Sequence, residues 1–340
     1  MDAALRILDA NLNRAREGLR TAEEYARLAL DDAQGRALLA GARGLIREFV
    51  ESNPTLAARL LEARDIACDV GLDRESAAPR AGLEDTARAA FKRAQEALRV
   101  IEETARLVVP GSAVLAARAR YMAYEAEARV LMAGPRLKTL RESPVMVVFT
   151  RALCRGSWRV ALEALIGAGA RLFQLREKEA EAGELIRHAA EFRALCQGVV
   201  LVNDRADVAR AANADGVHVG QRDLPPDSAR KAAGHGRLVG VSTHNAAEAA
   251  DAERAGADYL GLGAMFPTDS KKVESFAGPE VVRQVLAEAK LPLFCIGGVA
   301  PGNVARLREL GAKHAAAGAS VLGAARPSDA FRALVDGLAG

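Results

Sequence analysis

The first 135 residues carry the hydrophobic period of an α-helix. Apolar residues recur three and four positions apart, which is the stripe of an amphipathic helix. One such run is Leu12, Ala15, Leu19, Ala22 and Ala26. Helices are expected to end near residues 53–54, 79–82 and 110–111, where proline interrupts the pattern. The pattern predicts an all-α bundle over residues 1–135.

This helical half contains an internal repeat. Residues 11–30 align with residues 90–109 at an offset of 79, with ten of the twenty positions identical. We predict a duplicated helical unit. Each copy carries acidic and basic residues on one helical face: Glu17, Arg20, Glu24 and Arg27, then Glu96, Arg99, Glu103 and Arg106. That face is either a solvated surface of i,i+3 and i,i+4 ion pairs or an arginine-rich groove for an anion or a partner.

After a predicted linker at residues 136–144, the pattern changes to short apolar runs that alternate with helical segments. The expected strands are 145–150, 171–177, 198–204, 216–220, 238–243, 259–266, 293–298 and 314–320. The expected helices include 181–197, 245–256, 278–289 and 301–311. Eight strand–helix units predict a (β/α)8 TIM barrel over residues 145–340. A doubly wound open sheet is the alternative, but no GxGxxG motif follows the first strand.

Composition excludes several classes of protein. The 47 Lys and Arg against 44 Asp and Glu leave a net charge of +3, too small a bias to predict binding to nucleic acid or to an anionic membrane. No apolar run is long enough to span a membrane, and the N-terminus lacks a secretory signal. The four cysteines are far apart, which argues against disulfides or a thiolate zinc site. We expect a cytoplasmic protein that acts on small molecules; its oligomeric state is left open.

Polar side chains follow six of the predicted strands at their C-terminal ends, where a barrel builds its active site. They occupy segments 174–178, 203–204, 221–223, 242–244, 267–272 and 297–298. Any one surface loop is polar, but six at one end of a barrel indicate a site.

The residue types at these ends predict a bound polyanion. Arg176, Lys178 and Lys271 supply cationic donors for phosphate oxygens. Asp204 and Asp223, with the Asn203 amide beside them, are oxygen ligands of the kind Mg²⁺ takes together with water and substrate phosphates. The alternative for the two aspartates is simple helix capping, since each precedes a helix.

Two glycine-containing segments predict a second phosphate site. The loops after strands seven and eight of barrels often bind phosphate through backbone N–H groups. Gly297 and Gly298 let the backbone approach an anion closely, and Gly318-Ala319 is expected to supply the other half from strand eight. Two phosphorylated substrates in one mouth are therefore expected.

These motifs resemble those of a known family. The segments QLREK, VNDRADVARAANADGVHVGQRDLP, GVSTHN, GADYLGLGAMFPTDSKK and CIGGV occur in this order over residues 145–322. The chain resembles the thiamine phosphate synthases. The resemblance implies a Mg²⁺-dependent transferase of thiamine biosynthesis. Such an enzyme joins 4-amino-2-methyl-5-(diphosphooxymethyl)pyrimidine to 4-methyl-5-(2-phosphoethyl)thiazole and releases pyrophosphate.

The resemblance also implies roles for individual residues. Pyrimidine-diphosphate contacts fall on Gln174, Leu175, Arg176, Glu177, Lys178, Asn203, Ser242 and Lys271. Of these, Arg176, Lys178, Lys271 and Ser242 are expected to be catalytic. Mg²⁺ ligands fall on Asp204 and Asp223. Thiazole-phosphate contacts fall on Thr268, Asp269, Ser270, Gly297, Gly298, Gly318 and Ala319.

The chain departs from the family pattern at three places. The family's Thr-Pro-Thr-Lys is Thr268-Asp269-Ser270-Lys271, its Val-Ser on strand eight is Gly318-Ala319, and its Thr-Asp after strand one is Thr150-Arg151. The first two changes bear on affinity for the thiazole phosphate. They add a carboxylate and remove a hydroxyl there.

Two other functions remain open at this point. A thiazole tautomerase on the same barrel would need an acid–base histidine, for which His244 is the candidate, but would not need the whole diphosphate clamp. A non-catalytic regulatory protein would not need the charged strand ends. His218 lies within a predicted strand, where a packed and hydrogen-bonded histidine is expected.

Overall fold

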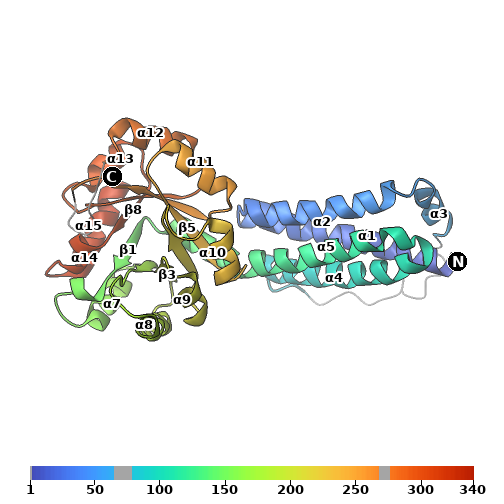
Figure 1. Ribbon diagram of the computed structural model, residues 1–340, viewed down its shortest axis with the longest axis horizontal. Coiled ribbons are helices and arrows are strands. Elements are labelled where there is room, and N and C mark those ends of the chain that lie inside the picture. Colours follow the sequence, from blue (N-terminus) through green and yellow to red (C-terminus); the bar gives the residue numbers. More distant parts are fainter. Residues whose placement is uncertain (1, 65–78, 268–275) are drawn as a thin grey trace. The chain divides into compact units, whose positions relative to one another are not determined.

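The computed structural model describes residues 2–64, 79–267 and 276–340. The chain divides into two compact units, Met1–Gly134 and Pro135–Gly340. Figure 1 shows the first as helices only and the second as strands surrounded by helices. Each unit is described separately below.

The first unit is a helical bundle. Its helices are α1 (Asp2–Glu24), α2 (Ala33–Glu51), α3 (Leu56–Glu62), α4 (Leu83–Val108) and α5 (Ala113–Ala128), with π-helical turns η1 (Tyr25–Ala29) and η3 (Arg129–Ala133) and a 3-10 turn η2 (Pro110–Ser112). Helices end close to two of the three proline-containing breaks, α2 at Glu51 and α4 at Val108, and α4 begins directly after the third. Helix α1 packs along α4 and α2 along α5, over fully buried side chains such as Leu12, Leu19 and Phe91. The two predicted repeats lie on the α1–η1 segment and on α4.

The charged face of each repeat consists of ion pairs along the helix. Glu24 pairs with Arg20 and Arg27, and Glu103 pairs with Arg99 and Arg106. The ion-pair interpretation is therefore confirmed.

The sequence pattern does not reveal a second layer of ion pairs beneath this face. Glu23 and Glu102 occupy equivalent positions in the two repeats, and each is only 6% exposed. Glu23 accepts a hydrogen bond from Arg43 of α2, and Glu102 accepts one from Arg120 of α5. A buried carboxylate requires such a partner, so these pairs fix α2 and α5 on the repeated helices.

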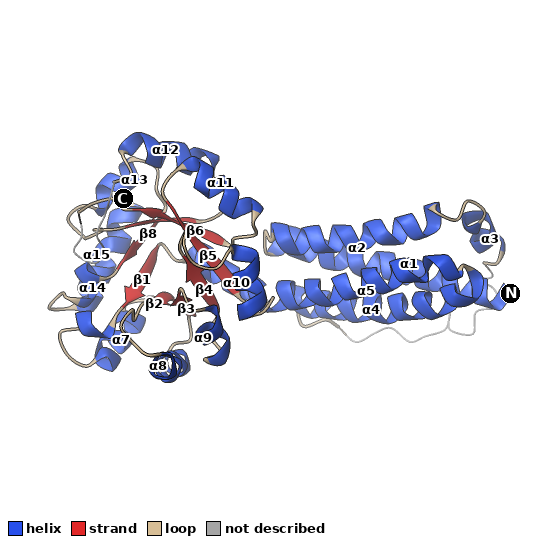
Figure 2. Ribbon diagram, viewed as in Figure 1, coloured by secondary structure: helices blue, strands red, loops and turns tan. Residues whose placement is uncertain are grey.

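The second unit is a closed barrel of eight parallel strands (Figure 2). The strands are β1 (Val145–Phe149), β2 (Leu172–Leu175), β3 (Val199–Asn203), β4 (Gly216–Val219), β5 (Leu238–Thr243), β6 (Tyr259–Gly263), β7 (Leu293–Ile296) and β8 (His314–Ala317). The barrel helices are α7 (Trp158–Gly167), α8 (Ala182–Leu195), α9 (Ala206–Ala211), α10 (Pro226–Ala233), α11 (Ala246–Arg254), α12 (Pro279–Glu288), α13 (Val304–Glu309), α14 (Ala319–Leu322) and α15 (Pro327–Ala339), with a 3-10 turn η4 (Arg151–Leu153) after β1. Strand β1 pairs with β8, which confirms the barrel and excludes the open sheet.

Alternation along each strand decides which side chains face the barrel interior. Phe173 and Leu175 of β2 belong to the hydrophobic core that also contains the surrounding helices. Gln174 lies between them on the opposite face. The same alternation turns Asn203 of β3, His218 of β4 and Ser242 of β5 toward the interior.

Three sequence-based boundaries are wrong. Strand β8 ends at Ala317, and Gly318 precedes the short helix α14, because Ala319–Leu322 are helix formers. Strand β6 ends at Gly263, three residues before the expected end. The predicted linker 136–144 mostly forms helix α6 (Gly134–Glu142).

Helix α6 is part of the barrel unit. The Arg136 guanidinium donates to Asp215 at 2.7 Å and to the Gly236 carbonyl at 2.6 Å. Asp215 is 3% exposed and also accepts the Val200 N–H. The helix therefore supplies a cation for a buried carboxylate of the barrel.

We therefore expect a chain of residues 135–340 to be more stable than one of residues 144–340. Removal of α6 takes the Arg136 guanidinium from Asp215, which keeps Arg193 and the Val200 N–H, a loss of about 2 kcal/mol in the free energy of unfolding. Urea unfolding of the two chains measures the difference. Lys138→Ala, an exposed change within the same helix, is the control and should leave the midpoint unchanged. Equal midpoints for the two chains would show that α6 contributes nothing to the barrel.

Candidate active site

Three predicted substrate-binding side chains come from inward positions near the C-terminal ends of strands. Gln174 of β2 is 3% exposed, while Asn203 of β3 and Ser242 of β5 are partly exposed. The residue before each of them, Phe173, Val202 and Val241, is apolar and belongs to the core that contains the helices. The alternation of the strands therefore brings these polar groups into the mouth of the barrel.

Asp204 and Asp223 lie close together although 19 residues separate them in sequence. Asp204 has a φ of 63°, and its N–H donates to the His218 carbonyl at 2.7 Å, which holds the end of β3 against β4. The Asp223 carboxylate accepts the Gly220 N–H at 2.7 Å after β4. Burial raises the pKa of Asp204, and the neighbouring, hydrogen-bonded Asp223 raises it further. The positive charges of Lys178 and Arg176 act in the opposite direction and lower the pKa of Asp204.

The helix-capping alternative for these aspartates is wrong. The residue that precedes α9 is Arg205, and the residue that precedes α10 is Pro225; neither helix has a side-chain cap. Asp204 and Asp223 are therefore not used to end a helix.

The aspartate pair fits Mg²⁺ better than a metal that requires an all-protein site. In the described part of the chain, no group of three or more His, Cys, Asp or Glu side chains is arranged to hold a metal ion. Mg²⁺ takes one or two carboxylates and completes its octahedron with water and substrate phosphates. The mutual effect of the two carboxylates on the Asp204 pKa is the repulsion that a bound cation would relieve.

The loop after β1 fixes the backbone on both sides of Arg176. The Arg176 N–H donates to the Phe149 carbonyl at 2.9 Å, and its own carbonyl accepts the Thr150 hydroxyl at 2.7 Å. Within residues 2–64, 79–267 and 276–340, neither Arg176 nor Lys178 forms an ion pair, so both cations are available to an anion. The strand end thus presents two positive charges beside two carboxylates.

Two residues of the predicted 174–178 contact segment do not face the mouth. Leu175 is fully buried in the core between the strands and the helices. The Glu177 carboxylate accepts the Arg151 N–H at 2.7 Å and pairs with the Arg151 guanidinium at 3.4 Å. Both side chains are thus held elsewhere, and a contact of these two residues with substrate stays a prediction.

Comparison with known proteins now decides the family. Residues 145–321 match the family model described as thiamine monophosphate synthase, and residues 6–129 match a model described as the ThiD2 family. The thiamine-phosphate synthase of Synechococcus sp. (strain WH7803) is 36% identical over 97% of this chain and 95% of that protein. The chain belongs to the thiamine monophosphate synthase family. This assignment confirms the predicted class, a transferase of thiamine biosynthesis.

Further relatives agree with this family assignment. The thiamine-phosphate synthase of Gloeobacter violaceus is 38% identical over 95% of this chain and 93% of that protein. The solved thiamine phosphate pyrophosphorylase from Pyrococcus furiosus aligns with a TM-score of 0.54 and 30% identity. It covers 59% of this chain but 97% of its own length. The first two relatives therefore share both units of this chain, whereas the third has the length of the barrel alone.

Within this family barrel, the two histidines near the mouth lie in different surroundings. His218 is 6% exposed and bonds Tyr259 and Ser242, as expected for a packed strand histidine; burial lowers its pKa to about 4. His244 is exposed and bonds Glu248 of α11 at 2.8 Å. That contact ties the Nδ1 side of His244 to the first turn of a helix.

The glycines at the ends of β7 and β8 allow close backbone approach. Gly297 and Gly298 have φ values of 98° and 63°, a region that favours glycine. A Cβ on Gly298 would lie 2.3 Å from the Pro267 carbonyl oxygen. Gly318 stands directly before α14, so the two glycine segments end neighbouring strands of the barrel. The predicted contacts Thr268, Asp269, Ser270 and Lys271 lie outside the described residues.

Two residues to which the sequence analysis gave no role in the site contact its residues. Tyr259, fully buried at the start of β6, reaches His218. Arg151, one of the departures from the family pattern, forms ion pairs with both Glu177 and Glu184. The sequence contained a signal for each: Tyr259 occupies an inward-facing position of its strand, and Arg151 and Glu177 carry opposite charges.

None of the described helices is both long and apolar enough to cross a membrane.

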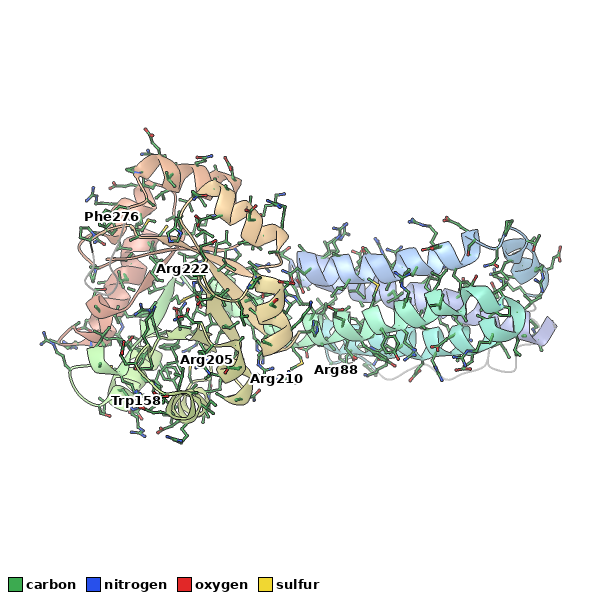
Figure 3. The ribbon with its side chains drawn as sticks, viewed as in Figure 1. Arg88, Trp158, Arg205, Arg210, Arg222 and Phe276 are labelled. Carbon is green, nitrogen blue, oxygen red and sulfur yellow. The ribbon has the colours of Figure 1, made fainter. Side chains whose placement is uncertain are left out.

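A buried histidine next to this site makes the stability of the fold depend on pH. His188 of α8 is 4% exposed and packs at 4.7 Å from the Trp158 ring, which Figure 3 labels. Burial, aided by the charge of Arg151, lowers its pKa from 6.5 to about 4. Below pH 6.5, His188 therefore binds a proton in the unfolded chain, whereas in the folded chain it stays neutral until about pH 4.

We expect protonation of His188 to lower the free energy of unfolding by about 3 kcal/mol as the pH falls from 6.5 to 4. The full stability is present above pH 6.5. His188→Leu cannot titrate, so its stability should decline less over this range. Urea unfolding of both proteins at several pH values measures the difference. Parallel declines would show that His188 is not the responsible group.

Proposed function

We propose that the mouth of the barrel joins 4-amino-2-methyl-5-(diphosphooxymethyl)pyrimidine to 4-methyl-5-(2-phosphoethyl)thiazole and forms thiamine phosphate and pyrophosphate. One observation carries this proposal. Asp204 and Asp223 lie together at the end of the barrel, where the charges of Arg176 and Lys178 act on Asp204. Two carboxylates beside two cationic side chains without ion-pair partners in the described chain fit a diphosphate bound together with Mg²⁺. They do not fit a pair of catalytic acids.

In this proposal the C–O bond to the diphosphate breaks before the new bond forms. The bond electrons stay on the departing pyrophosphate, and the aminopyrimidine ring delocalises the positive charge left on the methylene carbon. Arg176 and Lys178 are positive charges held in place before the reaction, and they stabilise the leaving group as its charge grows. Asp204 and Asp223 would hold Mg²⁺, which supplies further neutralisation of the diphosphate when bound.

The remaining side chains orient the two substrates. Gln174, Asn203 and Ser242 offer hydrogen-bonding groups to the pyrimidine half from the inward faces of β2, β3 and β5. The N–H groups near Gly298 and Ala319 would hold the phosphate of the thiazole, which fixes its approach. The thiazole nitrogen then forms the C–N bond. It carries no proton, so no general base is needed.

The proposal assigns catalysis to the barrel unit. The Pyrococcus furiosus pyrophosphorylase, of about the length of the barrel, supports this division. We propose residues 1–135 as an accessory helical domain. A reducing, cytoplasmic setting suits the free cysteines Cys154, Cys196 and Cys295.

The test is to incubate the full chain with both substrates and Mg²⁺ and to measure pyrophosphate and thiamine phosphate. We expect equal amounts of the two products, and none when either substrate or Mg²⁺ is omitted. Isomerisation of a thiazole without pyrophosphate would instead identify a tautomerase. No reaction in any combination would identify a non-catalytic protein.

A further inference from the structure

A line of hydrogen bonds crosses the inside of the barrel and ends at Ser242. The Ser242 hydroxyl lies 2.9 Å from His218 Nε2, and His218 Nδ1 lies 2.8 Å from the Tyr259 phenol oxygen. Ser242, a predicted pyrimidine-orienting residue, is thus backed by two residues to which the proposed reaction gives no role.

The surrounding residues are shaped to hold these two rings. A Cβ on Gly240 would lie 2.0 Å from the Tyr259 ring, and one on Gly261 would lie 3.2 Å from His218 Cε1. Phe294 closes the other side of Tyr259 at a ring distance of 5.7 Å. The inner faces of β5 and β6 therefore leave room for the rings but little room for them to turn.

The hydrogen bonds also have a direction. A neutral imidazole has one donor and one acceptor nitrogen, so it accepts from one hydroxyl and donates to the other. Tyr259 is fully buried, and among the described residues its phenol finds its hydrogen-bond partner in His218 Nδ1. A buried O–H without an acceptor is costly, so the phenol proton goes to His218 Nδ1, and His218 Nε2–H donates to Ser242. The Ser242 proton is left pointing away from His218.

We propose that His218 and Tyr259 are positioning residues that hold the Ser242 hydroxyl with its proton toward an acceptor atom of the pyrimidine substrate. The inference rests on the proposed function, because it gives Ser242 its substrate. Neither His218 nor Tyr259 touches the substrate in this proposal. Both act through the orientation of one hydroxyl group.

Two substitutions of His218 separate its two nitrogens. The amide of His218→Gln lies near the position of Nε2 and keeps a donor to Ser242. The amide of His218→Asn lies near Nδ1, keeps the contact with Tyr259 and loses Ser242. We expect His218→Gln to keep kcat within about threefold of the original, and His218→Asn to lower it about tenfold, the worth of one oriented hydrogen bond. KM should change less than kcat in both.

Combination with Ser242→Ala tests whether the effect passes through the serine. Ser242→Ala should lower kcat in the original chain and in His218→Gln, but add little in His218→Asn. Equal kcat for the Gln and Asn variants, or an equal effect of Ser242→Ala in all three backgrounds, would overturn the inference while the proposed function stands. An original chain without pyrophosphate release would overturn both.

Tyr259→Phe decides the matter if His218→Asn fails to fold, because it removes a single oxygen from the line of hydrogen bonds. It should lower kcat severalfold in the original chain, and Ser242→Ala should add less in this background than in the original. Full activity of Tyr259→Phe would contradict the inference. The melting temperature of each variant, measured alongside, identifies losses that come from unfolding.

Discussion

Replacement of Asp204 or Asp223 by asparagine is expected to lower Mg²⁺-dependent turnover about 10³-fold, since a catalytic metal contributes several kcal/mol to the transition state. Asparagine keeps the size of each side chain but removes the charge that a divalent cation needs. The two carboxylates lie close enough for Asp223 to raise the pKa of Asp204, so each is expected to supply one ligand. Initial rates of pyrophosphate release against Mg²⁺ concentration measure the loss.

The same substitutions should have the opposite effect on stability without metal. The raised pKa of Asp204 means that its ionised form is disfavoured in the folded chain. The stability of the metal-free protein at this site is therefore complete below the ordinary pKa and declines as the pH rises through the raised value. At neutral pH, loss of one repelling carboxylate should raise the melting temperature, and Mg²⁺ should stabilise only the original chain.

A matched control separates the metal site from negative charge in general. Asp227 on α10 is exposed and lies four residues beyond Asp223. Asp227→Asn should leave both turnover and the response to Mg²⁺ unchanged. Rates near those of the original chain for Asp204→Asn and Asp223→Asn would remove both residues from the metal site.

The sequence was sufficient for the barrel and for the end of it that carries the site. Alternating strand and helix patterns set the fold, and polar residues at six strand ends marked one mouth. Strand parity was also available, and it separates Gln174, which faces inward, from Leu175 in the core. Leu175 and Glu177 entered the predicted contact segment because a contiguous motif was taken whole. A motif follows the chain, whereas a binding surface on a strand uses alternate residues.

Other features depend on contacts between residues distant in sequence, which no local pattern contains. Arg136 belongs to the barrel because it reaches Asp215, 79 residues later. Without that contact its segment has the composition of a linker. Tyr259 acquires its place in the site only when β4, β5 and β6 stand side by side. The pairing of Glu23 with Arg43 is hidden for the same reason.

Arg176→Ala is expected to lower kcat about 10²–10³-fold, the loss typical of one group that stabilises developing negative charge in the transition state. Lys178 cannot compensate, because the Arg176 backbone is fixed by its N–H bond to the Phe149 carbonyl and by the Thr150 hydroxyl, which donates to the Arg176 carbonyl. Arg176→Lys keeps the charge but loses the two-pronged geometry that suits phosphate oxygens. It should recover part of the rate.

The kinetic constants identify what Arg176 contributes. A guanidinium that acts mainly on the leaving group lowers kcat when removed, whereas one that only holds the substrate raises KM. Arg210 lies in the last turn of α9, and the helices of a barrel return toward the end opposite the mouth, so Arg210→Ala is the matched control and should be silent. If Arg176→Ala raised KM at an unchanged kcat, the residue would be a substrate anchor, and the neutralisation of the departing diphosphate would have to come from elsewhere.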